Sequence, residues 1–250
     1  MELKKLVSES AKVRVFENGD KCVKVFKEPD EPKSVVFYEA LTHTRVEETG
    51  FAKMPELIGA EKSDGKWTLE YSFIKGKTLD EIMHEEPRSE ELLEKMADLH
   101  IEVNSLHSAK LSSLKVYLKR SIEGLDMIDD VKKYELLTKL SALEDASTVC
   151  HGDFMPENIV VNENGMYVVD WFKAKQGNPL ADVARTYLGF CLRHRTESAE
   201  KYLKIYCRKA QVDKIAVQEW LPIVAAAQLK FKRPEERELL LTWIDIADFL

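Results

Sequence analysis

Three oxygen-bearing side chains bracket a short hairpin in the second half of the sequence. Asp153 and Asn158 precede the run Ile159-Val160-Val161, and Asp170 follows the run Tyr167-Val168-Val169. A turn rich in Asn and Gly joins the two runs, which predicts a tight β-hairpin. Because the two ends of a hairpin lie together, we expect the three side chains to converge. Carboxylate and amide oxygens are the ligands and the base that a magnesium-nucleotide reaction requires.

The chemistry of these side chains suggests a role for each. We expect Asp170 to chelate magnesium, Asn158 to add a neutral oxygen ligand, and Asp153 to orient an attacking hydroxyl and accept its proton. The alternative interpretation is a plain turn, since Gly, Asp and Asn are common at hairpin ends. The combination of His151-Gly152-Asp153 with an aspartate that ends a strand favours the chemical interpretation.

Three stretches around this hairpin resemble a known family. They are residues 150–158, with the sequence CHGDFMPEN, residues 169–171 and residues 177–186. They are similar to the aminoglycoside phosphotransferase/choline kinase family of small-molecule kinases, which share the protein-kinase-like fold. The resemblance covers nearly the whole chain. It implies magnesium and ATP as cofactors, with GTP as an alternative nucleotide, and a small hydroxyl-bearing acceptor as the other partner.

The resemblance also implies residue roles. Asp153 would be the catalytic base, Asn158 and Asp170 would bind magnesium, and Asp182 would support the catalytic loop. Asp182 has an alternative interpretation as an acidic residue in the first turn of a helix, where negative charge is favoured. A protein kinase is disfavoured, because the eleven residues between Asp170 and Asp182 leave no room for a long activation loop.

Lys24 stands in a predicted strand where the family places the lysine that contacts nucleotide phosphates. Glu39 follows fifteen residues later within a predicted helix, and it could pair with Lys24 and hold the ammonium group towards the phosphates. Lys27 is the main alternative to Lys24, but its side chain points to the opposite face of the strand.

The phosphate-covering loop departs from the family pattern. The resemblance places this loop at residues 7–13, and the segment contains no glycine. Ser8 or Ser10 would then supply the hydroxyl and backbone donors for the phosphates. We therefore assign Ser10 as a candidate nucleotide contact.

The resemblance further implies a hinge that meets the adenine base. It falls near Tyr71, at Ser72, Phe73 and Ile74, just before Gly76. Backbone groups would bind the base there, so the identity of the side chains carries little information.

The first seventy residues have the pattern of a small antiparallel sheet with one helix. Short β-branched and aromatic runs at 13–16 and 22–26 flank Asn18-Gly19, which is a strong hairpin turn signal. A helical stretch follows at 34–49, and Asp64-Gly65 signals a second hairpin turn.

From Thr78 onward the pattern is nearly all helical, apart from the hairpin. Pro222 lies inside one predicted helix and should kink or split it. The predicted helices span about 89–107, 112–125, 131–143, 179–195, 197–210, 213–231 and 234–248.

These patterns together predict an α+β, protein-kinase-like bilobal fold. We expect an N-terminal nucleotide-binding lobe at 1–72, a hinge at 73–77, and a larger, mainly helical C-terminal lobe at 78–250. The larger lobe would carry the catalytic hairpin and the acceptor-binding region.

The composition excludes several other classes of protein. The 37 basic and 44 acidic residues give a net charge of −7 and a pI near 5.5, which argues against nonspecific nucleic-acid binding. Charged residues interrupt every apolar run, so we expect a cytoplasmic protein with no membrane or nucleic-acid partner. The four cysteines have no spacing typical of disulfide frameworks or zinc sites. Acidic residues gather at 80–150, which leaves open a cationic acceptor.

We therefore predict a phosphotransferase that moves the γ-phosphate of ATP to a hydroxyl of a small molecule, in the manner of aminoglycoside phosphotransferases. One alternative is a kinase of choline, homoserine, thiamine or a sugar-like alcohol. Another is a non-catalytic nucleotide-binding protein on the same fold, which the glycine-free loop mildly favours.

Overall fold

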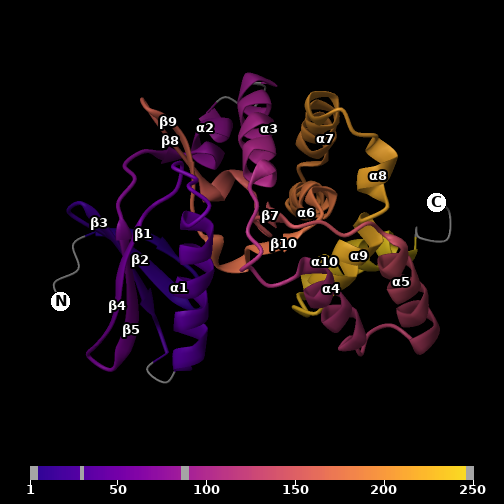
Figure 1. Ribbon diagram of the computed structural model, residues 1–250, viewed down its shortest axis with the longest axis horizontal. Coiled ribbons are helices and arrows are strands. Elements are labelled where there is room, and N and C mark those ends of the chain that lie inside the picture. Colours follow the sequence, from indigo (N-terminus) through magenta and orange to yellow (C-terminus); the bar gives the residue numbers. More distant parts are fainter. Residues whose placement is uncertain (1–4, 29–30, 86–89, 246–250) are drawn as a thin grey trace. The chain divides into compact units, whose positions relative to one another are not determined.

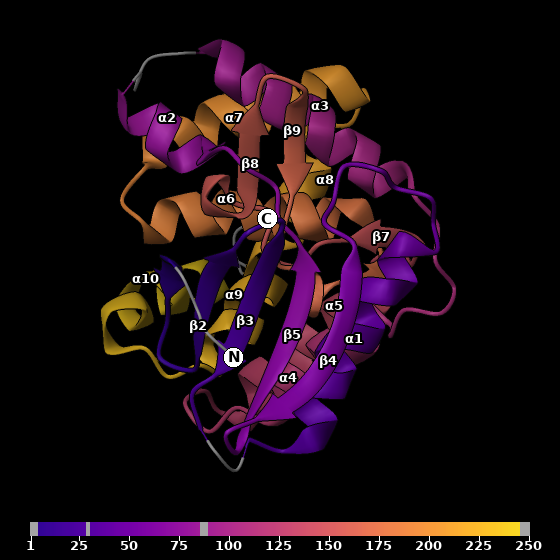
Figure 2. The ribbon, with the colours of Figure 1, turned by 90° about the vertical axis from the view of Figure 1, so that its left-hand side faces the viewer.

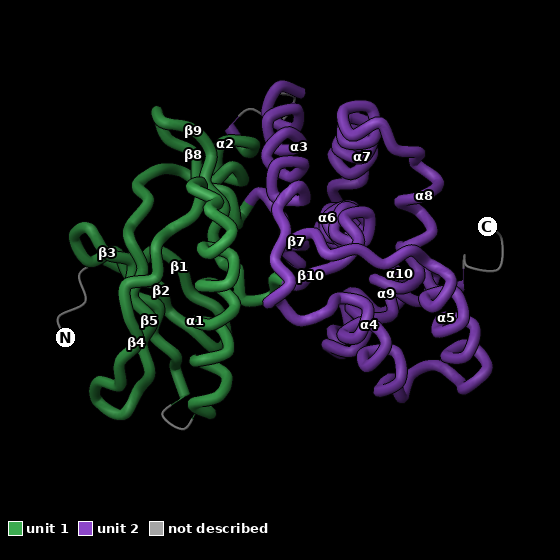
Figure 3. Tube along the Cα trace, viewed as in Figure 1, with its two compact units in different colours: residues 1–84, 157–174 green, residues 85–156, 175–250 purple. Residues whose placement is uncertain are grey.

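The computed structural model describes residues 5–28, 31–85 and 90–245. The chain forms two compact units, which are coloured separately in Figure 3. The first holds Met1–His84 and Glu157–Ala174, and the second holds Glu85–Pro156 and Lys175–Leu250. The hairpin expected in the helical lobe thus groups with the first unit. The lobe boundaries expected at 72, 77 and 78 stay a prediction.

A five-stranded antiparallel sheet dominates the first unit (Figure 1). The strand order is β1-β2-β3-β5-β4, and Figure 2 shows the sheet nearly face-on. The helix α1 (Lys33–Glu47) packs against one face of this sheet, as predicted from the helical stretch at 34–49. The strands are β1 (Lys5–Glu9), β2 (Val13–Asn18), β3 (Lys21–Phe26), β4 (Leu57–Ser63) and β5 (Lys66–Ser72).

Two tight turns set the register of these strands. Gly19 turns the β2–β3 hairpin with a φ of 76°, and the β4–β5 hairpin has positive φ at both central residues, Asp64 (49°) and Gly65 (78°). Such angles suit the right-handed twist of the paired strands and are easiest for Gly, Asn and Asp. Both predicted hairpin turns are therefore confirmed.

One strand was not expected from the sequence. Residues 7–13 were predicted as a loop, but β1 extends through Glu9 and pairs with β2, so only residues 10–12 form the turn. Every residue of β1 is exposed, so the strand lacks the alternation of buried and exposed side chains that reveals a half-buried strand.

The core of the first unit lies between the sheet and α1. Phe26, Leu69 and Tyr71 of the sheet pack against Val36 of the helix, with Val36 and Leu69 fully buried. Lys24 and Glu39 lie in the same layer, with 9% and 8% of their surface exposed. Burying two charged side chains in an apolar layer is costly unless they pair, so this core positions a specific ion pair.

A second, three-stranded sheet completes the first unit. Its order is β6-β8-β9, and it contains the predicted hairpin of β8 (Ile159–Asn162) and β9 (Gly165–Val168). The short strand β6 (Lys77–Thr78) leads into α2 (Leu79–Glu85). Thr78 and Glu81 cap this helix reciprocally: the Thr78 hydroxyl accepts from Glu81 N at 3.1 Å, and Glu81 accepts from Thr78 N at 2.7 Å.

Helices make up most of the second unit. Its short antiparallel strands β7 (Thr148–Cys150) and β10 (Lys175–Gly177) pair with each other. The helices are α3 (Glu90–Ser105), α4 (Leu114–Glu123), α5 (Asp130–Ala142), α6 (Pro179–Leu192), α7 (Thr196–Ala210), α8 (Lys214–Gln218), α9 (Leu221–Leu229) and α10 (Pro234–Asp245).

The predicted helices are confirmed within a few residues. Pro222 stands in the first turn of α9 and separates it from α8, so the predicted helix at 213–231 is split as expected. The predicted first residue of the helix at 89–107 and the last residues of the helix at 234–248 lie outside the described residues. None of the helices within the described ranges has both the length and the apolar character needed to span a bilayer.

Candidate functional site

The ammonium group of Lys24 contacts two carboxylates in the first unit. Its Nζ lies 2.6 Å from Glu39 Oε1 and 2.9 Å from Asp170 Oδ1. Burial alone would lower the pKa of Lys24, but the charges of Asp170 and Glu39 outweigh it and raise the pKa above its ordinary value. Lys24 is therefore a permanent cation held between two carboxylates. The predicted Lys24–Glu39 pair is present.

Residues around Glu39 hold its carboxylate in place. The Tyr71 hydroxyl donates to Glu39 Oε1 at 3.4 Å. The Tyr71 ring packs against the His43 ring with centroids 4.8 Å apart, and His43 Nε2 donates to the Pro55 carbonyl at 2.7 Å. Burial lowers the pKa of His43, which keeps it neutral near pH 7. Sequence patterns did not identify Tyr71 or His43 in these supporting positions.

Lys27, the alternative to Lys24, contacts a different carboxylate. Lys27 Nζ lies 2.6 Å from Glu9 Oε1, and Arg14 Nε donates to the same oxygen at 2.9 Å. The hydrogen bonds from Lys27 and Arg14 lower the pKa of Glu9 to about 2. Of the two lysines, Lys24 alone joins the Glu39–Asp170 cluster.

Asp170 has a left-handed backbone conformation, with φ 64° and ψ 57°. Aspartate tolerates this region better than most residues, and such outliers concentrate at functional sites. Neighbouring contacts define its position: Trp171 is buried and its Nε1 donates to the Val168 carbonyl at 3.0 Å. Val169 N donates to the Asn158 carbonyl at 2.9 Å, which places Asn158 beside the residue that precedes Asp170.

The donor set of Asn158 and Asp170 suits magnesium that arrives with a nucleotide. Magnesium prefers one or two protein oxygens and completes its shell with phosphates and water. Within the described residues, no group of three or more His, Cys, Asp or Glu side chains is arranged to hold a metal ion by itself. A carboxylate, an amide and the neighbouring Lys24 cation fit a metal–phosphate complex better than a bare ion.

Ser10 lies in the turn between β1 and β2. Its Oγ accepts weak bonds from Lys12 N at 3.4 Å and Val13 N at 3.3 Å, and its N donates to the Val13 carbonyl at 2.9 Å. The serine side chain thus closes a turn without the glycine that the family pattern has. Its hydroxyl hydrogen is not used in these bonds. The role of Ser10 in binding phosphate stays a prediction.

The predicted hinge residues differ in their backbone hydrogen bonds. Ser72 N donates to the Glu56 carbonyl, and Phe73 N donates to the Asp20 carbonyl at 2.8 Å. Among the described residues, Ile74 has no backbone hydrogen-bond partner. Phe73 and Ile74 also line a cavity of about 530 Å³ in the first unit. The role of the three residues in contacting adenine stays a prediction.

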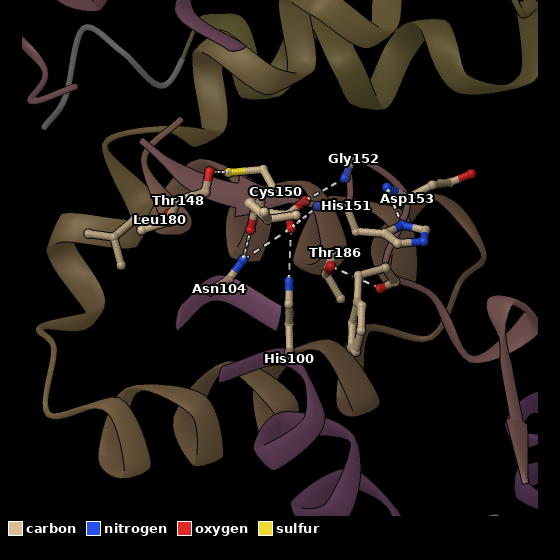
Figure 4. Close-up of polar contacts among 12 residues, drawn as sticks. His100, Asn104, Thr148, Cys150, His151, Gly152, Asp153, Leu180 and Thr186 are labelled. Atoms are coloured by element: carbon tan, nitrogen blue, oxygen red, sulfur yellow. Dashed lines mark hydrogen bonds and ion pairs between the residues drawn. The ribbon is translucent and has the colours of Figure 1, made fainter. Parts of the chain in front are cut away.

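In the second unit, Asp182 organises the loop that carries Asp153 (Figure 4). Its carboxylate accepts from His151 N at 2.6 Å, Gly152 N at 2.8 Å and His100 Nε2 at 3.0 Å. Burial alone would raise the pKa of Asp182, yet the hydrogen bond from His100, with further contributions from the loop, holds the pKa below its ordinary value. Asp182 is thus an ionised, buried support of the loop as well as a residue in the first turn of α6.

Pairs of polar residues one helical turn apart surround Asp182. His100 Nδ1 accepts from the Tyr202 hydroxyl at 2.5 Å. Asn104 donates to Asp182 at 3.3 Å and accepts from the Tyr206 hydroxyl at 3.1 Å. Each of α3, α6 and α7 supplies a pair at i and i+4: His100 and Asn104, Asp182 and Thr186, Tyr202 and Tyr206. Sequence patterns did not identify these contacts, although polar pairs at this spacing on apolar helix faces were the available signal.

Asp153 follows directly from this supported loop. Its N donates to His151 Nδ1 at 3.2 Å, and Thr186 Oγ1 donates to the carbonyl of the next residue, Phe154, at 2.9 Å. Its carboxylate Oδ1 lies 3.8 Å from an Arg185 nitrogen, and 18% of its side chain is exposed. The carboxylate thus has a cation close by and stays partly accessible, as a proton acceptor requires.

Comparison with known proteins places the chain in a family. The profile of the phosphotransferase enzyme family matches residues 5–221. The chain belongs to this family. A comparison with curated protein sequences gave no match. Members of the phosphotransferase enzyme family transfer phosphoryl groups. The roles of Asp153, Asn158, Asp170 and Asp182 in such a reaction stay a prediction.

Solved structures share the fold at low sequence identity. A thermostable mutant of aminoglycoside phosphotransferase APH(4)-Ia has a TM-score of 0.69 and 14% identity, over 99% of this chain and 94% of that one. The GDP and kanamycin complex of APH(2")-IIia has a TM-score of 0.62 and 16% identity, over 99% and 93%. Choline kinase LicA from Streptococcus pneumoniae, also solved with AMP, has a TM-score of 0.62 and 14% identity, over 99% and 92%. The predicted α+β, protein-kinase-like fold is confirmed.

Proposed function

We infer that this phosphotransferase family member moves the γ-phosphate of ATP, with magnesium, to a hydroxyl of a small molecule. The observation that carries the proposal is the Lys24 ammonium bonded to both Glu39 and Asp170. A buried ion pair adds little net stability, so the placement of Lys24 between two carboxylates favours a role in binding a ligand. Nucleotides in the structures of relatives, GDP and AMP, support a nucleotide as the donor.

In this proposal, Lys24 binds the phosphates and Glu39 keeps its ammonium group in place. Asn158 and Asp170 hold magnesium, and the ion neutralises charge on the phosphate oxygens when it is bound. Backbone groups at Ser72–Ile74 contact the base, with Ile74 the best candidate because its backbone groups have no partner among the described residues. The Ser10 hydroxyl donates to a phosphate oxygen. Most of the acceleration would come from positioning and charge.

Asp153 accepts the proton of the acceptor hydroxyl as the new bond between oxygen and γ-phosphorus forms. The bond from the γ-phosphorus to the β–γ bridging oxygen breaks, and ADP leaves with the electron pair. Two features support this role: the Asp182 carboxylate holds the loop by two backbone N–H groups, and Arg185 lies 3.8 Å from the Asp153 carboxylate. Both restrict where the base points.

An acceptor screen with a matched pair of variants tests the proposal. We expect magnesium-dependent transfer to at least one compound in a panel of aminoglycosides, choline, homoserine, thiamine and sugar-like alcohols. Asp153→Ala should lower kcat at least a hundredfold while ATP still binds. Asp98→Ala, which changes an exposed aspartate paired with Lys209, should leave kcat within twofold. Retained turnover in Asp153→Ala would remove Asp153 from the mechanism.

A non-catalytic nucleotide-binding protein is the second candidate. The turn closed by Ser10 in place of a glycine-rich phosphate loop favours it. A magnesium-dependent thermal shift with ATP, combined with no transfer to any acceptor in the panel, would support this second candidate over the enzyme.

A further inference from the structure

Arg185, on α6, carries hydrogen-bond donors that the described part of the chain leaves unused. Its Nη2 lies 3.8 Å from Asp153 Oδ1, which is an ion-pair distance but too long for a hydrogen bond. This side chain has no other polar contact among the described residues. Because a guanidinium has five N–H donors in one plane and no acceptor, Arg185 can bind an anion without giving up any hydrogen bond.

The Arg185 side chain is mostly buried, but its nitrogen atoms still reach solvent. Only 19% of the side chain is exposed. Among the described residues, the side-chain nitrogen and oxygen atoms that have neither solvent contact nor a hydrogen-bond partner belong to Glu157 and Trp243. The unused donors of Arg185 are therefore accessible. A charged group is usually hydrated at the surface or hydrogen-bonded inside, so a guanidinium that is largely enclosed and keeps accessible, unused donors favours a ligand.

The distance between Arg185 and the candidate base is set by the way the loop 151–155 packs on α6. The Asp182 carboxylate holds two backbone N–H groups of the loop, and one turn later Thr186 Oγ1 donates to a loop carbonyl at 2.9 Å (Figure 4). Another turn along, a Cβ on Gly189 would lie 2.6 Å from the Met155 Sδ, so loop and helix are in close contact there. Three successive turns of one helix face thus fix the loop.

Asp153 and Arg185 therefore face each other from two segments whose backbones are fixed. Arg185 directly precedes Thr186, and Asp153 directly precedes Phe154, whose carbonyl Thr186 binds. The simpler interpretation is an ion pair that keeps Asp153 in place. An ion pair without a hydrogen bond adds little to stability, however, and it does not account for donors that bind nothing.

The proposed reaction would bring the transferred phosphoryl group close to this pair. The acceptor hydroxyl donates to the Asp153 carboxylate, and the same hydroxyl oxygen attacks the γ-phosphorus. The non-bridging oxygens of the phosphoryl group would then lie beside a carboxylate that is 3.8 Å from Arg185. Arginine binds such oxygens through two parallel N–H···O bonds, and the transition state requires stabilisation of their negative charge.

The charge on Asp153 changes during this step in favour of a contact between Arg185 and the phosphoryl group. The bond between the acceptor oxygen and the γ-phosphorus forms, the bond to the β–γ bridging oxygen breaks, and ADP leaves with the electron pair. The hydroxyl proton moves to Asp153, which becomes neutral. The attraction of Asp153 for Arg185 falls, while the transferred group keeps its negative charge. No bond to Arg185 forms or breaks.

We propose that Arg185 is a further catalytic residue, which donates hydrogen bonds to the non-bridging oxygens of the phosphoryl group during its transfer. This rests on the proposed function, which supplies the nucleotide and makes Asp153 the base. Arg185 binds the group in transfer, whereas Lys24 binds the phosphates of the nucleotide. Sequence patterns did not identify Arg185, because its approach to Asp153 arises only when the loop 151–155 packs on α6.

Aluminium fluoride bound with magnesium-ADP mimics a phosphoryl group in transfer, and it tests the contact without turnover. The ratio of the Kd of ADP without and with aluminium fluoride measures how well the mimic is held. We expect a gain of about a hundredfold in the wild type and about tenfold or less in Arg185→Met, with partial recovery in Arg185→Lys. ADP alone should bind equally to all three. Arg208→Met is the matched control, because this exposed arginine of α7 pairs with Glu94.

Modification of arginines by phenylglyoxal in the wild-type chain gives a test that needs no variant. Adding aluminium fluoride to magnesium-ADP should slow labelling of Arg185 about fivefold or more and leave labelling of Arg208 unchanged, because the mimic covers the donors of Arg185 alone. Mass spectrometry of the labelled peptides measures both rates.

The outcomes separate this role from the proposed function. The same gain in Arg185→Met as in Arg208→Met, no gain in the wild type, or no protection of Arg185 would overturn the role of Arg185. In each of these cases binding of ADP would still support a nucleotide donor. No binding of ADP at all would instead remove the proposed function, and the role of Arg185 with it.

Turnover with any acceptor found in the panel extends the test to catalysis. We expect Arg185→Met to lower kcat about a hundredfold and to leave the KM for ATP within about threefold, since the contact is made in the transition state. The loss should be the same for neutral, cationic and anionic acceptors. A loss confined to the KM of anionic acceptors would mean that Arg185 binds the acceptor, and would refute the proposal.

Discussion

The ammonium group of Lys24 lies 2.9 Å from Asp170 Oδ1, an oxygen that the proposed function assigns to magnesium. The same ammonium is 2.6 Å from Glu39. Lys24 therefore contacts the carboxylate that the proposed function gives to magnesium. Under that proposal, phosphates would compete for Lys24 and release Asp170, so we expect nucleotide and metal to bind cooperatively. This coupling follows from charge alone, because the ammonium group and the metal ion repel each other when both contact one carboxylate.

Lys24→Met should separate metal binding from nucleotide binding. With the ammonium removed, Asp170 is free, and manganese used as a spectroscopic substitute should bind about tenfold more tightly in the absence of nucleotide, a change of about 1.4 kcal/mol. ATP should bind more weakly, since the phosphates lose their cation. Lys27→Met is the control, because Lys27 pairs with Glu9. Equal manganese affinity in the two variants would contradict the competition.

Gly76→Ala should destabilise the segment 73–77 that the sequence predicts as the hinge. A Cβ there would lie 2.3 Å from the Val161 carbonyl oxygen, so β6 could no longer approach β8 as it does. We expect a loss of about 2 kcal/mol in the free energy of unfolding, measured in urea. Gly59→Ala is the matched control, because nothing lies within 4 Å of the added atom. Similar losses in both variants would show that close packing at Gly76 is not the cause.

Local signals explain which parts of the fold were predictable. The turns at Gly19 and Asp64-Gly65 were recognisable because positive φ restricts the residue type at each position. The helix boundaries followed from periodicity and from Pro222. Strand β1 gave no signal, because all its side chains are exposed and it is held by backbone pairing with β2. Burial patterns cannot reveal a strand that buries nothing.

The residues of the candidate site also differ in how far the sequence could predict them. Asp153, Asn158 and Asp170 could be proposed as candidates because they surround one hairpin. The Lys24–Glu39 contact was predictable because Glu39 follows Lys24 within one strand–helix unit. The partners of Asp182 were not recognisable individually: His100 and Tyr202 come from helices that only the tertiary fold brings together. Contacts between distant helices depend on packing of whole faces, which a single sequence does not specify residue by residue.

Cys22 should react slowly with alkylating reagents although it is not fully buried. Burial raises the pKa of its thiol to about 11, despite the nearby charge of Lys24. At pH 8 the thiolate fraction, and with it the rate of iodoacetamide labelling, should be about a hundredfold lower than for a thiol with the ordinary pKa of 9.0. Mass spectrometry of the native chain, with the urea-unfolded chain as reference, measures this rate. Half-maximal labelling near pH 9 in the native chain would contradict the shift.

Asp182→Asn should both destabilise the chain and change how its stability depends on pH. The amide cannot accept from His151 N, Gly152 N and His100 as a carboxylate does, and it leaves buried donors without a charged partner. We expect a loss of about 3 kcal/mol at pH 7, and a lower kcat as the Asp153 loop loosens. Asp64→Asn, in an exposed turn, should change the stability by less than about 0.5 kcal/mol.

The direction in which the stability changes with pH follows from the lowered pKa of Asp182. The pKa of Asp182 is lower in the folded chain than its ordinary value, so between these two pH values the unfolded chain binds more protons than the folded one. The stability that Asp182 contributes is therefore complete above the ordinary value near 3.8 and is lost as the pH falls through the lower folded value. Unfolding midpoints of the wild type and Asp182→Asn, measured from pH 7 to pH 2, should converge only below pH 4. A gap that closes between pH 7 and pH 5 would mean that a histidine of the cluster, and not the carboxylate, carries the charge that holds the loop.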